Sequence, residues 1–254
     1  MLAVFFLVVA AEAAEAGPRD DMLSMSIEEL MDVVITTASK KAETADSAPG
    51  IVTVITREEI DAYGGRNLGE VLGRVASTIF LSANVVTDNL VSFRRQTLTP
   101  YNTHVLILLN GRPVRDPIAG GLNNAVYAVF PVDAIDHLEI VRGPGSVLYG
   151  SNAYSAVINV ITRVVDDDDG VSGRLGLTGG SWSALAQRAM VNVGEDDLRL
   201  TLALSRWDDD GPEYTFTGYR DSTATTRWFR ETTGLLADVQ HRNVRAQFYY
   251  GDFQ

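Results

Sequence analysis

The sequence predicts an α+β domain followed by a run of antiparallel β-strands, and three local patterns support this fold class. Apolar, β-rich stretches flank a tight turn at Gly143-Pro144-Gly145, the second of them running from Val157 to Ile161. Leucine and valine recur at helical spacing between Leu68 and Val75. After Gly170 the chain changes to segments in which apolar and polar residues alternate, which is typical of strands with one apolar face.

The N-terminus has the features of a secretory signal peptide. An apolar run extends from Leu2 to Ala11, and the small residues after it offer cleavage after Ala13 or Ala16. A helix that spans a bilayer needs about 20 residues, so this run is too short to be one. We assign residues 1–16 to the signal peptide, and a buried N-terminal helix is the alternative.

Composition excludes several kinds of site and partner. The formal net charge of −12 leaves no basic stripe for nucleic acid, and the absence of cysteine excludes thiol catalysis, Cys-ligated zinc and disulfides. The histidines His104, His137 and His241 lack the spacing of a metal-binding pair. No nucleophile, base and orienting group occur together as a motif. We therefore expect no catalytic residues, no metal site and no nucleic-acid partner.

Alternating segments follow an acidic linker at residues 164–170. Leu198, Leu200, Leu202 and Leu204 alternate with Arg199, Thr201, Ala203 and Ser205, and similar patterns occur at 171–178 and 243–250. About four or five such strands fit before Gln254. A barrel strand between lipid and a polar lumen has this pattern, and so has a strand of a sandwich with one wet face, so alternation leaves both open. The acidic run Asp166–Asp169 could bind calcium, but it lacks the spaced ligand pattern, and a solvated linker is favoured.

The stretch 140–153, Ile-Val-Arg-Gly-Pro-Gly-Ser-Val-Leu-Tyr-Gly-Ser-Asn-Ala, resembles the C-terminal signature of the plug domain in TonB-dependent outer-membrane receptors. The resemblance extends upstream in the family's order. It covers a strand at Ile51–Thr56, a short helix from Arg57 to Ile60, a helix at Asn67–Val75, a strand at Val105–Leu109 with a turn at Asn110-Gly111, and the segment Ala128–Ile140.

This resemblance implies an α+β plug domain at residues 42–163. It also implies that residues 171–254 begin an antiparallel transmembrane β-barrel, which in these receptors has about 22 strands. The sequence is then expected to be an N-terminal fragment of a longer receptor with an incomplete barrel. Its signature turn comprises Gly143, Pro144, Gly145, Tyr149 and Gly150, and Arg142 and Arg94 are expected to contact the barrel wall.

Residues 17–41 precede the plug and contain a stretch that resembles a TonB box, the peptide by which these receptors bind TonB in the periplasm. The stretch comprises Asp32, Val33, Val34, Ile35, Thr36, Thr37 and Ala38. Binding would occur by addition of a strand to a sheet edge of TonB. We expect this segment to be extended, exposed and separate from the core of the plug.

The implied function is import of a metal chelate, either a ferric siderophore or a cobalamin-like ligand, across the outer membrane of a Gram-negative bacterium with energy from TonB. The protein is then not an enzyme and needs no cofactor. Candidate ligand loops carry Ser82, Asn84, Gln96, Tyr101, Arg115 and Asn123. A truncated plug protein that binds a ligand or signals without transport is the alternative, and a β-rich periplasmic hydrolase has no catalytic motif to support it.

Overall fold

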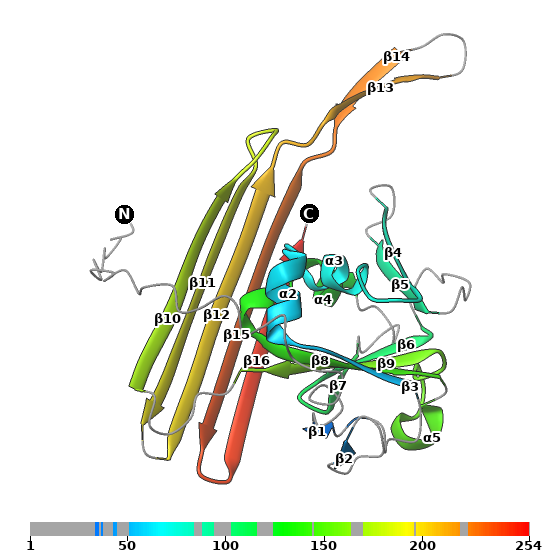
Figure 1. Ribbon diagram of the computed structural model, residues 1–254. Coiled ribbons are helices and arrows are strands. Elements are labelled where there is room, and N and C mark those ends of the chain that lie inside the picture. Colours follow the sequence, from blue (N-terminus) through cyan, green and yellow to red (C-terminus); the bar gives the residue numbers. More distant parts are fainter. Residues whose placement is uncertain are drawn as a thin grey trace.

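The computed structural model describes residues 34–35, 37, 43–44, 51–83, 88–93, 103–115, 124–143, 145–163, 170–195, 197–218 and 223–253. The described residues between 51 and 163 form an α+β unit, called the plug below. The later residues form a long-stranded sheet, called the wall, and the plug packs against one face of it (Figure 1). Among the described residues, no helix has the length and apolar character needed to cross a membrane.

A five-stranded sheet forms the centre of the plug. Its order is β3 (Ile51–Ile55), β8 (Ile135–Arg142), β9 (Ala156–Thr162), β6 (Val105–Leu109) and β7 (Arg112–Val114). β9 and β6 are parallel, and the other neighbours are antiparallel. Asn110 and Gly111 both have positive φ, 48° and 78°, which suits the two-residue turn that joins β6 to β7.

Short helices cover one face of this sheet, and residues near their ends set their limits. α2 (Arg57–Tyr63) begins with a capping box between Thr56 and Glu59, and it ends at Gly64, whose φ is 65°. α3 (Leu68–Leu72) begins at Asn67, whose side chain accepts a hydrogen bond from the Glu70 N–H. Two further elements complete this side, α4 (Asn124–Val129) and the 3₁₀ turn η1 (Val132–Ala134).

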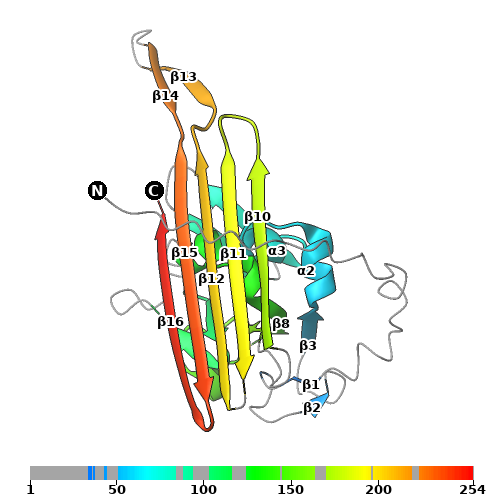
Figure 2. The ribbon, with the colours of Figure 1, turned by 90° about the vertical axis from the view of Figure 1, so that its left-hand side faces the viewer.

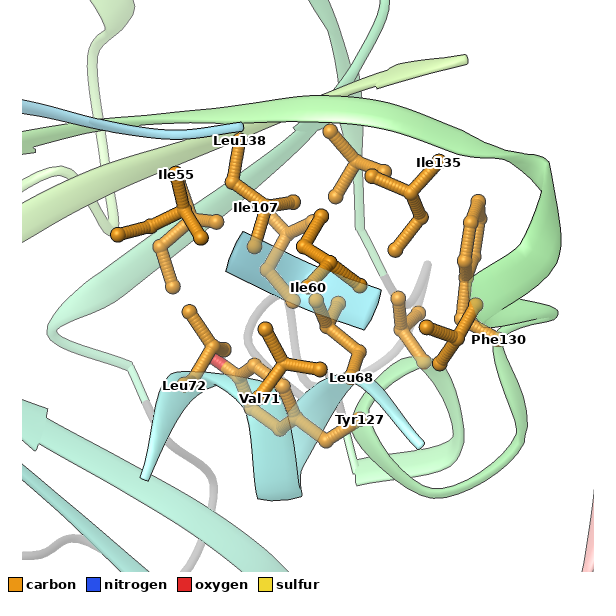
Figure 3. Packing of buried hydrophobic residues seen from close by; sticks show 14 of the residues in the cluster. Ile55, Ile60, Leu68, Val71, Leu72, Ile107, Tyr127, Phe130, Ile135 and Leu138 are labelled. Atoms are coloured by element: carbon orange, nitrogen blue, oxygen red, sulfur yellow. The ribbon is translucent and has the colours of Figure 1, made fainter. Parts of the chain in front are cut away.

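The main hydrophobic core lies between these helices and the sheet (Figure 3). Ile60, Val71 and Leu72 of the helices point toward Ile107 and Leu138 of the strands. The helical spacing between Leu68 and Val75 is confirmed as a buried stripe. The opposite face of the sheet carries a smaller apolar cluster of Leu106, Leu108, Ala153 and Val157.

The signature region joins β8 to β9. These strands pair antiparallel, as the sequence predicts, and Arg142 lies opposite Ala156. The connection contains a short helix, α5 (Ser146–Tyr149), that the turn pattern alone did not predict. A second unpredicted feature is the hairpin of β4 (Thr78–Ala83) and β5 (Asp88–Phe93). α2, α3 and this hairpin lie on the side of the plug sheet away from α5 (Figure 1).

The wall contains five antiparallel strands in the order β10 (Gly170–Gly179), β11 (Leu185–Glu195), β12 (Leu198–Asp209), β15 (Arg230–His241) and β16 (Val244–Phe253). These five wall strands agree with the expected four or five, but two further strands, β13 and β14, also lie after Gly170. Gly170, expected in the linker, is the first residue of β10. Figure 2 shows the five strands side by side with the plug behind them. The separate hairpin of β13 (Glu213–Thr217) and β14 (Thr223–Arg227) rises beyond the ends of β12 and β15 (Figures 1 and 2).

The two faces of the wall differ in the way that the alternation predicts. Leu198, Leu202 and Leu204 are exposed on the outer face, whereas Thr201 and Ala203 are buried against the plug. Strand pairing extends this outer surface across the sheet as three apolar rows. These rows are Leu175/Ala189/Leu204/Leu235/Tyr250, Gly173/Val191/Leu202/Ala237/Phe248 and Val171/Val193/Leu200/Val239/Ala246.

Candidate functional site

The end of α4 sits in a recess of the wall that only glycine permits. A Cβ added at Gly234 would lie 1.8 Å from the carbonyl oxygen of Val129, and one at Gly251 would lie 2.6 Å from the Val129 side chain. The Ser205 hydroxyl donates a hydrogen bond to the same carbonyl oxygen at 3.2 Å. Beside this recess the rings of Phe130 and Tyr249 stack with centroids 5.4 Å apart. The recess thus fixes where the plug meets the wall.

A buried carboxylate makes a second contact between plug and wall. Asp238 of β15 is 5% exposed and accepts a hydrogen bond from the Thr162 hydroxyl at 3.0 Å. Arg245 of β16 binds the same carboxylate through Nε at 2.9 Å and donates to the Thr162 hydroxyl oxygen at 3.1 Å. Gln247 also donates to Asp238, at 2.7 Å. The end of β9 is therefore tied to two wall strands by charge-assisted hydrogen bonds.

Two wall arginines meet acidic groups of the plug. The guanidinium of Arg174 lies 3.6 Å from Asp133 and 3.4 Å from Asp61, and Arg188 lies 3.7 Å from Asp133. Burial acts to raise the pKa of Asp61, but Arg57 and Arg174 outweigh it, so the pKa is below its usual value. These contacts orient the plug through opposite charges, with acids on the plug and bases on the wall.

A cation–π contact also joins the plug to the wall. The guanidinium carbon of Arg66 lies 4.6 Å from the centre of the Trp207 ring on β12. The carboxylate of Glu70 holds this arginine by accepting from its Nε at 2.8 Å. The start of α3 is thereby fastened to the wall.

Arg142 and Arg94 are the two arginines that the resemblance to the receptor family leads us to expect at a barrel wall. Arg142 is the last residue of β8 and lies opposite Ala156 of β9. Arg94 lies outside the described residues. Contact of either residue with a barrel wall stays a prediction. Sequence patterns gave no signal for the observed contacts, because each joins residues remote in the chain.

The signature turn needs glycine at particular positions. Gly143 and Gly150 have φ of 127° and 74°, and a Cβ at Gly145 would lie 2.8 Å from the Val157 side chain. Pro144 lies outside the described residues. Arg115, expected in a ligand loop, donates to the carbonyl oxygens of Tyr149 and Ser151 at 2.9 Å each. It therefore supports the backbone around α5, and its contact with a ligand stays a prediction.

The N-terminal segment is bound to the plug near this turn. Val34 and Ile35 form a short strand, β1, which pairs with β2 (Glu43–Thr44). Thr37 is only 1% exposed. Its backbone N–H donates to Glu139 Oε2 at 3.1 Å, its hydroxyl donates to the same oxygen, and its carbonyl oxygen accepts from the Tyr149 hydroxyl at 2.8 Å. The expectation of an exposed, separate segment is therefore wrong at Thr37, because the plug satisfies both of its backbone groups.

The residues that bind Thr37 lie on the face of the sheet opposite the helices. Glu139 and Asn159 pair directly across β8 and β9 and are 2% and 1% exposed. Asn159 Nδ2 donates to Thr37 Oγ1 at 2.9 Å and to Glu139 Oε2 at 3.2 Å. Its own side-chain oxygen accepts from the Gly111 N–H at 2.9 Å. The amide is thus held in the orientation that binds Thr37.

His137 supplies a positive charge beside the buried carboxylate. Its Nε2 lies 3.6 Å from Glu139 Oε1, and its Nδ1 lies 2.7 Å from Asp136. Burial acts to lower the pKa of His137, but the hydrogen bond with Asp136 and the negative charges of Asp136 and Glu139 outweigh this and raise the pKa to about 9. The imidazolium therefore carries its charge at neutral pH. Burial, with the charge of Glu139, raises the pKa of the Tyr149 phenol, which keeps it a hydrogen-bond donor.

Sequence analysis missed Glu139 and Asn159, although a signal existed. Each interrupts an apolar run in a strand, Leu138–Val141 and Val157–Ile161. A polar residue within such a run is expected to have a specific partner, because burial without one is costly. Their partner Thr37 could not be identified, because it lies 102 and 122 positions away.

The remaining candidate ligand residues stay predictions. Ser82 lies at the tip end of β4, and Asn84, Gln96, Tyr101 and Asn123 lie outside the described residues. An open cavity of about 490 Å³ adjoins the start of β4. Its lining includes Tyr63, Arg74, Thr78 and Phe80. Glu70 lines it as well, so one cation, one carboxylate and two aromatic residues border a space of the size that small ligands occupy.

The chain resembles known proteins over both of its parts. The family model of the TonB-dependent receptor plug domain matches residues 44–157. The vitamin B12 transporter BtuB of Photobacterium profundum is 30% identical over 131 residues, which are 52% of this chain and 20% of that protein. This chain therefore spans about a fifth of the length of that curated relative.

Solved structures share the fold of plug and wall together. The outer-membrane ferripyoverdine receptor of Pseudomonas aeruginosa, bound to ferripyoverdine, superposes with a TM-score of 0.64 at 18% identity, covering 87% of this chain and 28% of the receptor. The alcaligin outer-membrane receptor FauA of Bordetella pertussis gives a TM-score of 0.57 at 20% identity, covering 87% of this chain and 42% of the receptor. At these identities the likeness establishes the fold.

Proposed function

Residues 44–157 match the TonB-dependent receptor plug domain, and we propose a function for the protein on this basis. The chain supplies the plug and the first wall strands of an outer-membrane receptor. This receptor binds a metal chelate, a ferric siderophore or a cobalamin-like ligand, and imports it with energy from TonB. Residues 1–16 are proposed to direct export, and residues 32–38 to bind TonB.

The arrangement of the wall carries this proposal. Its outer face presents apolar rows, as a strand surface in lipid requires, while its inner face binds the plug through Gly234, Asp238 and Arg174. A soluble sandwich would bury an apolar face against a second sheet. Here the buried face meets a mixed α+β domain through polar contacts, which suits a plugged barrel.

The ligand class is supported by the relatives and by the cavity. The similar proteins are a vitamin B12 transporter and receptors for ferripyoverdine and alcaligin. The cavity beside β4 offers Arg74 and Glu70, which carry opposite charges, to polar groups of a chelate, and Tyr63 and Phe80 to its flat groups. α2 and α3, which contribute Tyr63 and Glu70 to the lining of the cavity, lie on the side of the plug sheet opposite β1 and β2 (Figure 1). Ligand and TonB would then bind on opposite sides.

Growth on defined iron and cobalamin sources tests the transport function. A strain that carries the full-length gene should grow on at least one ferric chelate or corrinoid that does not support the deletion strain. If the full-length protein binds such a chelate but both strains grow equally on it, the protein is a binding or signalling module. Absence of both binding and a growth difference would contradict the proposal.

The TonB-binding segment has its own test. Val34→Pro removes a backbone donor from the peptide and should abolish uptake while ligand binding persists. Thr44→Pro is the matched control, because Thr44 is the pairing partner of Val34 in β2 and lies outside residues 32–38. Loss of uptake in Val34→Pro alone supports strand addition. Equal loss in both variants would mean that the β1–β2 pairing matters instead.

A further inference from the structure

Glu70 of α3 belongs both to the cavity beside β4 and to the contact that joins α3 to the wall. Its side chain lines the cavity together with Arg74 and Phe80. Its carboxylate also binds Arg66, accepting from the backbone N–H at 2.9 Å through Oε2 and from Nε at 2.8 Å through Oε1. The guanidinium of Arg66 in turn lies over the Trp207 ring. One carboxylate therefore connects the lining of the cavity to a wall strand.

The loop between α2 and α3 forms one side of the cavity and carries Arg66. Gly64 and Gly65 line the cavity, and Arg66 follows them directly. The loop packs tightly on α3, since a Cβ added at Gly65 would lie 2.7 Å from a methyl carbon of Val71. The position of Arg66 and the shape of the cavity are therefore set by the same few residues.

Opposite charges line the cavity. Burial acts to raise the pKa of Glu70, but its hydrogen bonds with Arg66 and the positive charges of Arg66 and Arg230 outweigh this and hold the pKa below its usual value. Glu70 is therefore a carboxylate at neutral pH, while Arg74 supplies a positive charge. These two groups suit a ligand that carries a cationic or hydrogen-bond donor group as well as an anionic one.

We propose that Glu70 is the specificity-determining residue of this cavity and that Trp207, which does not line the cavity, tunes its affinity through Arg66. A ligand with an ammonium group or another strong donor competes with Arg66 for the carboxylate, whereas an anionic or apolar group at the same point does not. Because Trp207 holds the Arg66 guanidinium near Glu70, loss of the cation–π contact favours the ligand. That the ligand is a metal chelate rests on the proposed function, whereas the competition rests on these contacts.

The exposure of Arg66 sets the expected size of this effect. Its side chain is 49% exposed, and a cation–π contact at an exposed site is weak. Loss of the contact should therefore strengthen binding of a donor group at Glu70 by about two- to fivefold. The effect is reciprocal, so a donor group bound at Glu70 should weaken the contact of Arg66 with Trp207 by the same factor.

Charges tethered in the cavity test the proposal without a natural ligand. This chain has no cysteine, and Ile79 lines the cavity with 45% of its surface exposed, so Ile79→Cys in the full-length receptor provides a labelling site. Any cysteine elsewhere in the receptor is first replaced by serine. Methanethiosulfonate reagents then attach aminoethyl, aminohexyl, sulfonatoethyl or hydroxyethyl arms. Hydrogen exchange of the Arg66 amide reports the result, because Glu70 binds this N–H directly.

The two ammonium arms should accelerate exchange of the Arg66 amide at least threefold, and the sulfonate and hydroxyl arms should not. Glu70→Gln should abolish this charge dependence, and Glu58→Gln is the matched control, since Glu58 is exposed on α2. Equal exchange with ammonium and sulfonate arms, or an ammonium effect that persists in Glu70→Gln, overturns the role of Glu70.

Arg66→Lys provides an independent variant if Glu70→Gln does not fold. Lysine keeps the positive charge but loses the planar, forked guanidinium that binds Glu70 and stacks on Trp207. Because it competes less well for the carboxylate, the ammonium arms should accelerate exchange of the residue 66 amide more than in the parent. An ammonium effect that is the same as in the parent contradicts the competition.

Trp207→Leu tests the contribution of the wall. It should enlarge the ammonium effect about two- to fivefold. Trp182→Leu, at an exposed wall tryptophan that does not line the cavity, should leave the effect unchanged. An equal ammonium effect in both variants overturns the role of Trp207. Charge selection at Glu70 in a receptor that transports nothing would contradict the proposed function alone, whereas transport without charge selection would contradict this inference alone.

Discussion

Glu139 and Asn159 show how single residues decide the character of a buried surface. Both lie on the face of the plug sheet that also carries Leu108 and Val157. Apolar residues at these two positions would make that face more hydrophobic and leave the backbone N–H and the hydroxyl of Thr37 without their partners there. The buried pair instead selects one residue of the N-terminal segment. Such specificity is a recognised use of buried polar groups when each has its partners.

His137 makes the stability of this region depend on pH. Its pKa of about 9 in the folded plug lies above the ordinary value of 6.5, so the protonated form favours the fold. This stabilisation, on the order of 2–3 kcal/mol, should be fully present below pH 6.5 and lost as pH rises to about 9. Urea unfolding of the plug, followed by circular dichroism at pH 6 and pH 10, measures the change. His137→Gln should remove most of it, and an unchanged pH dependence in that variant would contradict the assignment.

Gly234 leads to a prediction about plug docking. Gly234→Ala places a methyl group against the Val129 carbonyl and should destabilise the docked plug by about 1–3 kcal/mol. Gly176→Ala is the control, because Gly176 lies in the same inward row and its added Cβ would meet only the Arg188 side chain, at 3.5 Å. Limited proteolysis of the folded receptor should cut the plug faster in Gly234→Ala than in Gly176→Ala. Equal rates would show that the α4 recess does not hold the plug.

Among the helices and strands, the sequence predicted those in which apolar residues repeat within a few consecutive positions. The apolar stripe of α3 and the alternation of β12 are visible in a few consecutive residues, and both are confirmed. β13 and β14 were missed because they are short and rich in threonine, with no apolar face that repeats. The contact between Val129 and Gly234 depends on how plug and wall pack. No local pattern reports such a contact, so the candidate site was predicted less completely than the fold.

The outer face of β12 should tolerate charge poorly. Leu202→Arg at the middle apolar row should cost about 2–4 kcal/mol if that row faces lipid. Thr201→Arg on the inner face is a poor control, because Thr201 is 3% exposed and donates to the Arg163 carbonyl. Ser172→Arg is better matched, since Ser172 is exposed on the inner side at similar depth.

Folding of the full-length receptor into lipid bilayers, followed by urea titration, compares these two variants. Leu202→Arg should unfold at lower urea concentration than Ser172→Arg. Similar losses in both would mean that the outer face of the wall is not in lipid, and a soluble β-sheet module would then be the better account.

At the scale of the whole molecule, plug and wall share part of one core. Met190, Ala203 and Leu236 of the wall belong to the same buried cluster as Ile135 and Phe130 of the plug. Most of that cluster nevertheless comes from the plug's own helices and strands (Figure 3). Wall side chains therefore close one side of the plug's hydrophobic core. The plug in turn buries polar wall groups such as the Asp238 carboxylate.

Because most of the plug core comes from the plug itself and a smaller part from the wall, we can predict how the plug folds when it is expressed alone. Residues 42–163 expressed without the wall should be soluble and unfold cooperatively, because α2 and α3 bury their apolar faces on the plug's own sheet. The separated plug should also unfold at lower temperature than the docked plug, since the surface around Phe130 loses the ring of Tyr249 and the recess at Gly234. Circular dichroism during heating measures both properties. A disordered spectrum would show that the plug depends on the wall to fold, and equal stability with and without the wall would show that the shared core contributes little.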